Sequence, residues 1–305
     1  VAAGVYDEER TPDGKLQLRS GVSVYGGFAG DETALAQRDI AVNETIIDGS
    51  VANAGEPAVQ VVVGAGYLRL DGVTIRGGRG YSGAGMYNDG NQFVIEGLTV
   101  ANCLFTDNEA TAFGGGMFNL GNVQASIIDC LFDGNSAGIS GGGMLNQGPS
   151  PLVSDCDFTN NQAGDGGGMF NLSGSAPAVE RCFFRDNLAD TSGGAVGLLE
   201  SDETALFSRC VFENNEASGF GGAIFNNAAS PRVEACWFYD NGAGESGGAF
   251  ACTTGGGAAP APTIVNSYFA DNLATVYGGG VFVNTADPVI VNCTFDGNTA
   301  ISSGG

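Results

Sequence analysis

The chain has 305 residues, of which 34 are acidic and 11 are basic, and its formal net charge at pH 7 is −23. A charge of this sign repels phosphate backbones and anionic lipid surfaces, so we exclude nucleic acid as a partner. The sequence has no apolar run of the roughly 18 residues that a membrane-spanning helix needs, and we expect no transmembrane segment. Glycine occupies 52 positions, but the apolar fraction of 43% is too high for a disordered glycine-rich polymer. We infer that glycine stands at fixed structural positions.

The first 50 residues combine strand-like segments with charged loops. The chain begins with "VAAGVY", which is typical of a strand, and shows no signal peptide, so we expect a leader and further residues outside the given sequence. The charged stretches 7–15 and 30–39 predict loop excursions. Early coils, with Ile or Val where Phe and Cys stand later, are expected in "GVSVYGG" (21–27), "ETIIDGS" (44–50) and "GVTIRGG" (72–78).

A repeat of about 26 residues follows, centred on a phenylalanine. An aliphatic or aromatic residue stands five positions before each Phe, Cys (once Ser267) two before it, Asn three after it and Ala five after it. A glycine pair and another apolar column, which holds all four methionines, come next. Cys-x-Phe alternation is the period of a strand with one buried face, and the short repeat leaves no room for a helix. The Phe column comprises Phe105, Phe132, Phe158, Phe184, Phe212, Phe238, Phe269 and Phe295.

This pattern predicts an all-β fold, the parallel β-helix. We expect three short strands per coil, each paired with its copy one turn on, about 4.8 Å away. Identical residues then stack, so that buried Asn side chains form a ladder and Phe rings stack inside. We expect one domain over 1–305 with about eleven coils, irregular over 1–50 and regular over 51–305. Because the sequence ends at "ISSGG", halfway through a repeat, we expect a fragment of a longer chain, or another molecule that covers the last strand edge.

The chain has eight cysteines, seven of them in the inward column of the repeat. Stacked Cβ atoms with parallel vectors fit disulfide geometry poorly, so we expect buried free thiols. The stacked cysteines would present their sulfur atoms in a line, not a tetrahedron, and the sequence has no C-x-x-C pair, so we do not expect a metal site in this column. Cys252 stands alone at a position that Asn occupies elsewhere, and the sequence assigns it no role.

Few residues are suited to catalysis. A polysaccharide lyase needs a strong base, usually Lys, Arg, His or Tyr, but the chain has no histidine and one lysine, Lys15, so only the arginines offer a cluster. Aspartates stand at the turns, where Asp, Asn and Gly are generally favoured. The alternative is that they form a carboxylate pair for hydrolysis or bind calcium. We assign no catalytic residue, no metal ligand and no cofactor, and keep calcium as an alternative. The residues weighed are the clustered Arg181, Arg185 and Arg209, interpreted as solvated, and the aspartates Asp107, Asp186, Asp240 and Asp271.

One outward surface carries aromatic residues in several turns. The residue between Cys and Phe should point outward, and in three repeats it is Phe183, Trp237 or Tyr268, with Tyr239 beside them. Such a stripe can stack sugar rings or contact a protein, unless the loop 252–262 folds over it. We assign these four residues as candidates for ligand or partner binding. A second outward stripe, which would need a cover if exposed, comprises Tyr87, Phe118, Leu145, Phe170, Phe225 and Phe282.

The paired motifs F-x-x-N and G-G-A/G-apolar resemble the repeat of the polymorphic outer-membrane proteins, a family of bacterial surface β-helices. They appear here as FTDN, FDGN, FTNN, FRDN, FENN, FYDN and FADN, with GGGM, GGAV, GGAI, GGAF and GGGV. The opening "VAAGVY" with "GVSVYGGFAGDET" looks like the start of secreted bacterial right-handed β-helix repeat proteins, which have the pectate-lyase-like superfamily fold. The resemblance covers essentially the whole chain. It implies a right-handed coil, export and an adhesive or display role, and it carries no catalytic residues because the motif is structural.

We therefore expect a non-catalytic rod, exported to the extracellular space or the cell surface, that acts as an adhesin, spacer or assembly component. Its expected partners are other copies of the chain or cell-surface components, with polysaccharide as a further candidate. The alternatives are a polysaccharide-active enzyme, either lyase or hydrolase, and a carbohydrate-binding module that uses the aromatic stripe.

Overall fold

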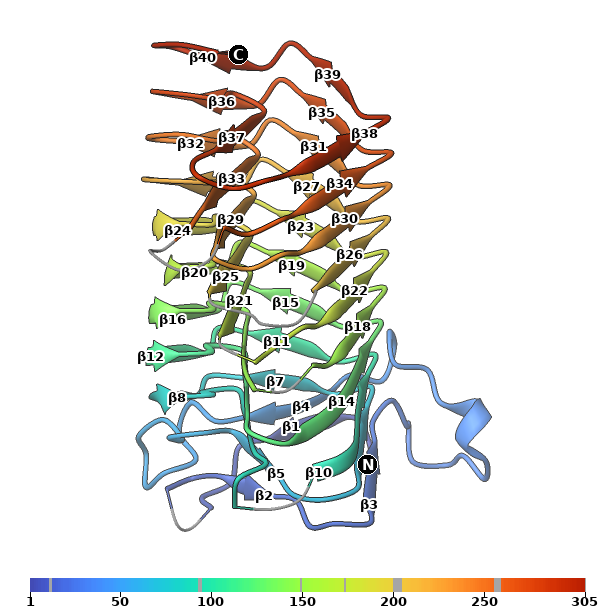
Figure 1. Ribbon diagram of the computed structural model, residues 1–305. Helices are drawn as coiled ribbons and strands as arrows, with labels where there is room; N and C mark the ends of the chain where they lie inside the picture. Colours follow the sequence, from blue (N-terminus) through green and yellow to red (C-terminus); the bar gives the residue numbers. More distant parts are fainter. Residues whose placement is uncertain are drawn as a thin grey trace.

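The computed structural model describes residues 1–10, 13–92, 95–148, 150–172, 174–199, 205–254 and 259–304. The chain winds in stacked turns into a long rod (Figure 1), and each regular turn crosses four parallel sheets. We name them, in the order of a turn, the Val, Phe, Ala and Met sheets after their inward columns. The expectation of three strands per turn is wrong, because the Ala column forms a strand of its own between the Phe and Met columns.

The strands of the four sheets are short and recur in the same order. The Val sheet consists of β3 (Val22–Tyr25), β6 (Leu68–Asp71), β10 (Ile95–Ala101), β14 (Val123–Ile128), β18 (Leu152–Ser154), β22 (Ala178–Glu180), β26 (Leu206–Ser208), β30 (Arg232–Glu234), β34 (Thr263–Val265) and β38 (Val289–Val291). The Phe sheet consists of β1 (Gly4–Tyr6), β4 (Thr45–Asp48), β7 (Thr74–Arg76), β11 (Leu104–Thr106), β15 (Leu131–Asp133), β19 (Asp157–Thr159), β23 (Phe183–Arg185), β27 (Val211–Glu213), β31 (Trp237–Tyr239), β35 (Tyr268–Ala270) and β39 (Thr294–Asp296). The Ala sheet consists of β8 (Arg79–Ser82), β12 (Glu109–Phe113), β16 (Ser136–Ser140), β20 (Gln162–Asp165), β24 (Leu188–Ser192), β28 (Glu216–Ala217), β32 (Gly242–Ala243), β36 (Leu273–Ala274) and β40 (Thr299–Ala300). The Met sheet consists of β2 (Leu16–Gln17), β5 (Val62–Gly64), β9 (Met86–Asp89), β13 (Met117–Leu120), β17 (Met144–Gln147), β21 (Met169–Leu172), β25 (Val196–Leu199), β29 (Ile224–Asn227), β33 (Phe250–Thr253) and β37 (Val281–Val283). A single 3-10 turn, η1 (Leu35–Gln37), lies between β3 and β4.

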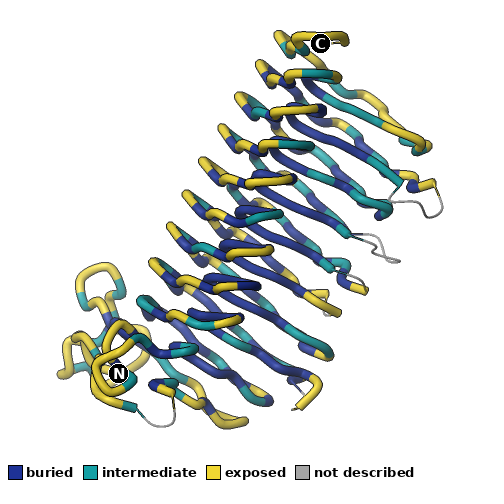
Figure 2. The backbone as a smooth tube through the Cα atoms, turned by 90° about the vertical axis from the view of Figure 1, so that its left-hand side faces the viewer, coloured by how far each residue is buried: buried dark blue, intermediate teal, exposed yellow. Residues whose placement is uncertain are grey.

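The all-β parallel β-helix expected from the sequence is confirmed. Within the described residues the Ala sheet has nine strands and the Phe sheet eleven, which gives about nine complete turns where we expect eleven. The difference arises because the first coils contribute no strand to the Ala sheet. Figure 2 shows that burial follows the strands of the central turns and that exposure is concentrated at the corners, in the N-terminal excursions and in the last turn.

Two inward columns form continuous ladders. From Phe105 to Phe295, neighbouring rings of the Phe column lie 4.6–5.0 Å apart and within 9° of parallel. The Nδ2 of Asn135 donates to Oδ1 of Asn161 (3.1 Å) in the next turn and to the carbonyl oxygen of Phe105 (2.9 Å) in the preceding one. Buried amides need such partners, because an unpaired polar group away from water is costly. The predicted asparagine ladder is confirmed.

Two of the three early segments lie where the pattern predicts. Ile47 pairs with Ile75, and Ile75 pairs with Phe105, so "ETIIDGS" and "GVTIRGG" are earlier copies of the Phe-sheet strand. The third assignment is wrong, because Val24 of "GVSVYGG" pairs with Leu70 in the Val sheet. Strand β1, formed by the first residues, already occupies the Phe-sheet position beside β4.

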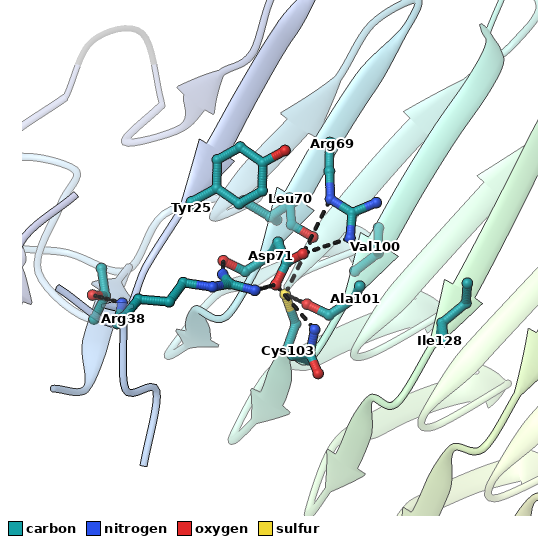
Figure 3. Close-up of polar contacts among 12 residues, drawn as sticks. Tyr25, Arg38, Arg69, Leu70, Asp71, Val100, Ala101, Cys103 and Ile128 are labelled. Atoms are coloured by element: carbon teal, nitrogen blue, oxygen red, sulfur yellow. Dashed lines mark hydrogen bonds and ion pairs between the residues drawn. The ribbon is translucent and has the colours of Figure 1, made fainter. Parts of the chain in front are cut away.

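A buried carboxylate fastens the second loop excursion to the rod (Figure 3). Asp71 accepts bonds from Arg38 of the excursion (2.6 Å), from Arg69 (2.6 Å) and from Asn102 (3.0 Å). Both guanidinium groups also lie over the ring of Tyr25, at 5.5 and 5.9 Å from its centroid. Burial alone would raise the pKa of Asp71, but the hydrogen bonds from its three partners outweigh burial and leave the pKa below its usual value.

The outward face of the Met sheet is covered by the chain itself. After each Ala-sheet strand a glycine turn folds back, and we call this strand and its turn the Ala-sheet arm. Gly114 has φ +60°, and a Cβ there would collide with the carbonyl oxygen of Met117 and lie 2.9 Å from the Cβ of Phe118. Beneath the arms, Phe118, Leu145 and Phe170 form a buried apolar cluster. The central part of the second outward stripe is therefore not an exposed apolar face.

Candidate functional site

The four aromatic candidates lie on the outward face of the Phe sheet, in β23, β31 and β35. Their neighbours in the Phe column point inward, and successive residues of a strand face opposite sides. Trp237 is 54% exposed, whereas Phe183, Tyr239 and Tyr268 are partly exposed. Strand β27 places Val211 between Phe183 and Trp237 in the register. The candidates therefore form two groups, one around Trp237 and one around Phe183.

Trp237 and Tyr268 form a ring pair on neighbouring strands. Their centroids are 5.3 Å apart and the rings are inclined by 50°. The hydroxyl of Tyr268 donates to Oδ2 of Asp296 at 3.2 Å, and desolvation together with this carboxylate raises the pKa of Tyr268. The tyrosine is held by its hydroxyl, while the indole stays open to solvent. An exposed indole beside a fixed phenol is a platform on which a sugar ring can stack.

The second group joins Phe183 to charged side chains. The guanidinium carbon of Arg185 lies 4.5 Å from the centroid of the Phe183 ring, and its Nε donates to Oε2 of Glu213 at 2.8 Å. Partial burial and the carboxylate of Glu213 raise the pKa of Tyr239, the fourth candidate. This group presents a planar aromatic and polar surface that suits hydroxyl-bearing ligands.

Two of the three clustered arginines, Arg181 and Arg185, form ion pairs at the surface. Arg181 donates through Nε and Nη2 to the two oxygens of Asp155, each at 2.7 Å. Arg185 is paired with Glu213, and Arg209 is exposed. Exposed pairs of this kind contribute little to stability.

The turn aspartates have a backbone reason to be there. All four have φ values of 53–55°, a left-handed conformation that Asp, Asn and Gly adopt most readily: Asp107, Asp186, Asp240 and Asp271. The residues that the structure describes hold no group of three or more His, Cys, Asp or Glu side chains placed to bind a metal ion. Asp157 differs from these aspartates, because it lies in register with Phe183 on the exposed outward face and partial desolvation raises its pKa.

The cysteine column packs inward as free thiols, as expected. The Sγ of Cys156 donates to the carbonyl oxygen of Ile127 in the preceding turn at 3.5 Å. Burial raises the pKa of Cys103 well above its usual value. Cys252 lies in the Met sheet, where its Sγ accepts a bond from Nδ2 of Asn226 at 3.1 Å. The Met sheet has its own asparagine ladder, in which Asn88, Asn119, Asn146 and Asn171 are bonded in series, and Cys252 occupies the same column.

The comparisons with known proteins agree with this architecture. A family model described as right handed beta helix region matches residues 57–257. The match spans more than half of the chain, so the chain belongs to the right-handed β-helix family, with the handedness that the resemblance implies. Neither the curated proteins nor the solved structures provide a match. Within the described part of the chain, we find no helix of the length and apolarity that crossing a bilayer requires.

Proposed function

We propose that the protein is a non-catalytic, exported β-helical rod that acts as an adhesin at the cell surface or in the extracellular space. The F-x-x-N and G-G-A/G motifs, which resemble those of the polymorphic outer-membrane proteins, support export and adhesion. The ladders of stacked Phe and bonded Asn support a stiff scaffold, because every turn is bonded to the next. Spacer and assembly roles share this scaffold but make no use of a ligand face.

The exposed Trp237–Tyr268 pair carries the proposal. Large aromatic side chains on a sheet face usually find a partner, since leaving them in water is unfavourable. The pair lies on the flat outward face of the Phe sheet, with the Phe183–Arg185 group two strands away. Planar rings bordered by charged and hydroxyl groups suit a glycan.

A glycan array tests this proposal, probed with the wild type and the Trp237→Ala/Tyr268→Ala variant, each with and without calcium. The matched control is Tyr67→Ala, which removes an exposed tyrosine from the Val-sheet side of the rod. We expect the wild type and the control to bind the same glycans and the double variant to lose them. Equal binding by all three proteins would contradict the proposal, and binding that needs calcium would add a metal to the site.

A second candidate, a polysaccharide-active enzyme, is favoured by one observation. Asp157 has a raised pKa and lies beside Phe183, as a general acid near a sugar platform would. Incubation with plant and microbial polysaccharides, followed by analysis of reducing ends, distinguishes the two functions. Fragments that disappear with Asp157→Asn would favour the enzyme, whereas binding without fragments would favour the adhesin.

A further inference from the structure

The N-terminal end of the Met sheet differs from the rest of that sheet, because strands β2 and β5 lie beyond β8, the first strand of the Ala sheet (Figure 1). The Ala sheet begins at β8, so in the described residues β2 and β5 of the Met sheet have no Ala-sheet arm over them. A groove follows this outward face from β2 past β5, β9 and β13 to β17, with the first arm as its wall. Five strands at about 4.8 Å spacing make it about 19 Å long, which suits a chain molecule better than a single small ring.

Aromatic side chains form one wall of the groove. Tyr81 of the first arm is 66% exposed, and its ring lies edge-on to Phe113 at 6.3 Å. Deeper in the groove, the ring centroids of Tyr87 and Phe118 are 5.6 Å apart, and the hydroxyl of Tyr87 donates to Oδ2 of Asp89 at 3.4 Å. Phe118 and Asp89 hold Tyr87 in place, so this part of the platform is formed before a ligand arrives, which lowers the entropy cost of binding.

Amide side chains from separate elements line the same groove: Gln17, Gln60, Gln92 and Gln147. Each amide offers a carbonyl acceptor and two N–H donors, the combination that pairs with adjacent hydroxyl groups. Gln60 already donates to the carbonyl oxygen of Ser82 at 3.3 Å, which fixes its orientation. Aromatic faces combined with amides are suited to a polyhydroxylated ligand.

The groove carries few charged side chains, unlike the chain as a whole. Its charged lining consists of Lys15, which pairs with Asp13 at 3.2 Å, and Asp89. The Oδ1 of Asp89 accepts the backbone N–H groups of Asn91 and Gln92, so this carboxylate is occupied by the protein. A polyanion would gain no net attraction here and would be repelled by the net charge of −23.

We infer that this groove binds an uncharged polysaccharide that lies along the rod axis. Its rings stack on Tyr81 and Tyr87, and its hydroxyls bond to the glutamine amides. The site is separate from the Trp237 face and does not depend on the function proposed for that face.

Affinity gel electrophoresis tests the inference, with gels that contain soluble glucan, mannan, xylan or polygalacturonate. The variants are Tyr81→Ala and Gln147→Ala. The matched control is Tyr277→Ala, which removes an exposed tyrosine at the opposite end of the rod. We expect at least one neutral polysaccharide to retard the wild type and the control. Each groove variant should show a Kd raised about five- to tenfold, with an unchanged melting temperature.

Three results would overturn the inference: no retardation by any neutral polysaccharide, equal retardation of Tyr81→Ala and wild type, or stronger retardation by polygalacturonate. The Trp237→Ala/Tyr268→Ala variant separates the two sites. If it keeps full binding to the neutral polysaccharide, the groove is the site. If it alone loses binding, the Trp237 face is the site and the groove is not.

Discussion

Asn171 and Asn226 face Leu198 from opposite sides in the Met sheet, and neither Nδ2 of Asn171 nor Oδ1 of Asn226 has a hydrogen-bond partner in the described structure. Up to that point each amide donates to the next, in the series Asn88, Asn119, Asn146 and Asn171. Leu198 therefore interrupts the ladder. On both sides of it, each bonded Nδ2 donates to the residue in the following turn. Each unpaired buried group costs about 1–3 kcal/mol.

Leu198→Asn should stabilise the protein. The new Oδ1 can accept from Asn171 and the new Nδ2 can donate to Asn226, and Asn has nearly the shape of Leu. Two satisfied polar groups outweigh the lost leucine burial, so we expect a net gain of about 1 kcal/mol in the free energy of unfolding. Urea unfolding measures the gain. The reverse change, Asn146→Leu, is the control and should destabilise, and a loss of stability in Leu198→Asn would show that the ladder does not close.

Phe212→Ala should cost about 3–5 kcal/mol, because it leaves a cavity in a packed column. The Phe212 ring is fully buried and stacks on Phe184 at 5.0 Å and on Phe238 at 4.7 Å. Trp237→Ala, one strand further on the outward face, should change stability by less than about 0.5 kcal/mol. Thermal melting of the two variants checks both values. A larger loss for Trp237→Ala would reverse our assignment of inward and outward faces.

The stability of the protein should fall in mildly alkaline solution. Burial raises the pKa of Cys103 and Cys130 in the folded chain, while the unfolded thiols titrate near pH 8.5. Below about pH 8 both states keep their thiol protons and these groups leave stability unchanged. Above about pH 8.5 the unfolded chain loses protons that the folded chain retains, so the free energy of unfolding decreases with pH. Urea midpoints between about pH 7 and 9.5 measure the decrease.

Cys210→Ser is the matched control for this pH effect. Ser267 already occupies the same column, where its hydroxyl donates to the carbonyl oxygen of Val265 at 2.9 Å. The substitution removes one titrating thiol from the interior, so its stability should decrease less steeply with pH. A midpoint that is independent of pH in the wild type would contradict the burial of the column.

Asp71→Asn should release the second loop excursion. The variant loses the ion pairs with Arg38 and Arg69, at a cost of the order of 2 kcal/mol, less than for a fully buried pair because Arg69 is partly exposed. Trypsin should then cleave after Arg38 faster than in the wild type, which mass spectrometry detects. Glu109→Gln, which removes the exposed pair with Arg79, is the control and should leave this cleavage unchanged. Equal cleavage rates for Asp71→Asn and the wild type would mean that other contacts hold the loop.

The inward columns could be predicted from the sequence because each repeats one chemical requirement in every turn. Phe105, Asn108 and Ala110 recur at fixed spacing, and that periodicity defines the parallel stacking. The number of sheets could not be predicted in this way. Several strands of the Ala sheet are too short to show an alternation, as in the two-residue strand β28, where Ala217 alone is buried.

Of the candidate site, the outward direction of Trp237 and Tyr268 follows from strand alternation alone. Their ring contact, and the separation of Phe183 by Val211, required the register between strands. The groove beside Tyr81 depends on where the Ala sheet starts, and no local pattern near Tyr81 signals that boundary.

The Phe stack stays continuous although the turns differ in length. The longest steps are 28 residues before Phe212 and 31 before Phe269, and the extra residues fall between the Met and Val sheets. The rings nevertheless lie 5.0 Å and 4.6 Å from their neighbours in the preceding turn. That corner is therefore a suitable insertion site for protein engineering. A foreign epitope inserted there would be displayed on one side of the rod at a chosen turn, while the strands of that turn keep their geometry.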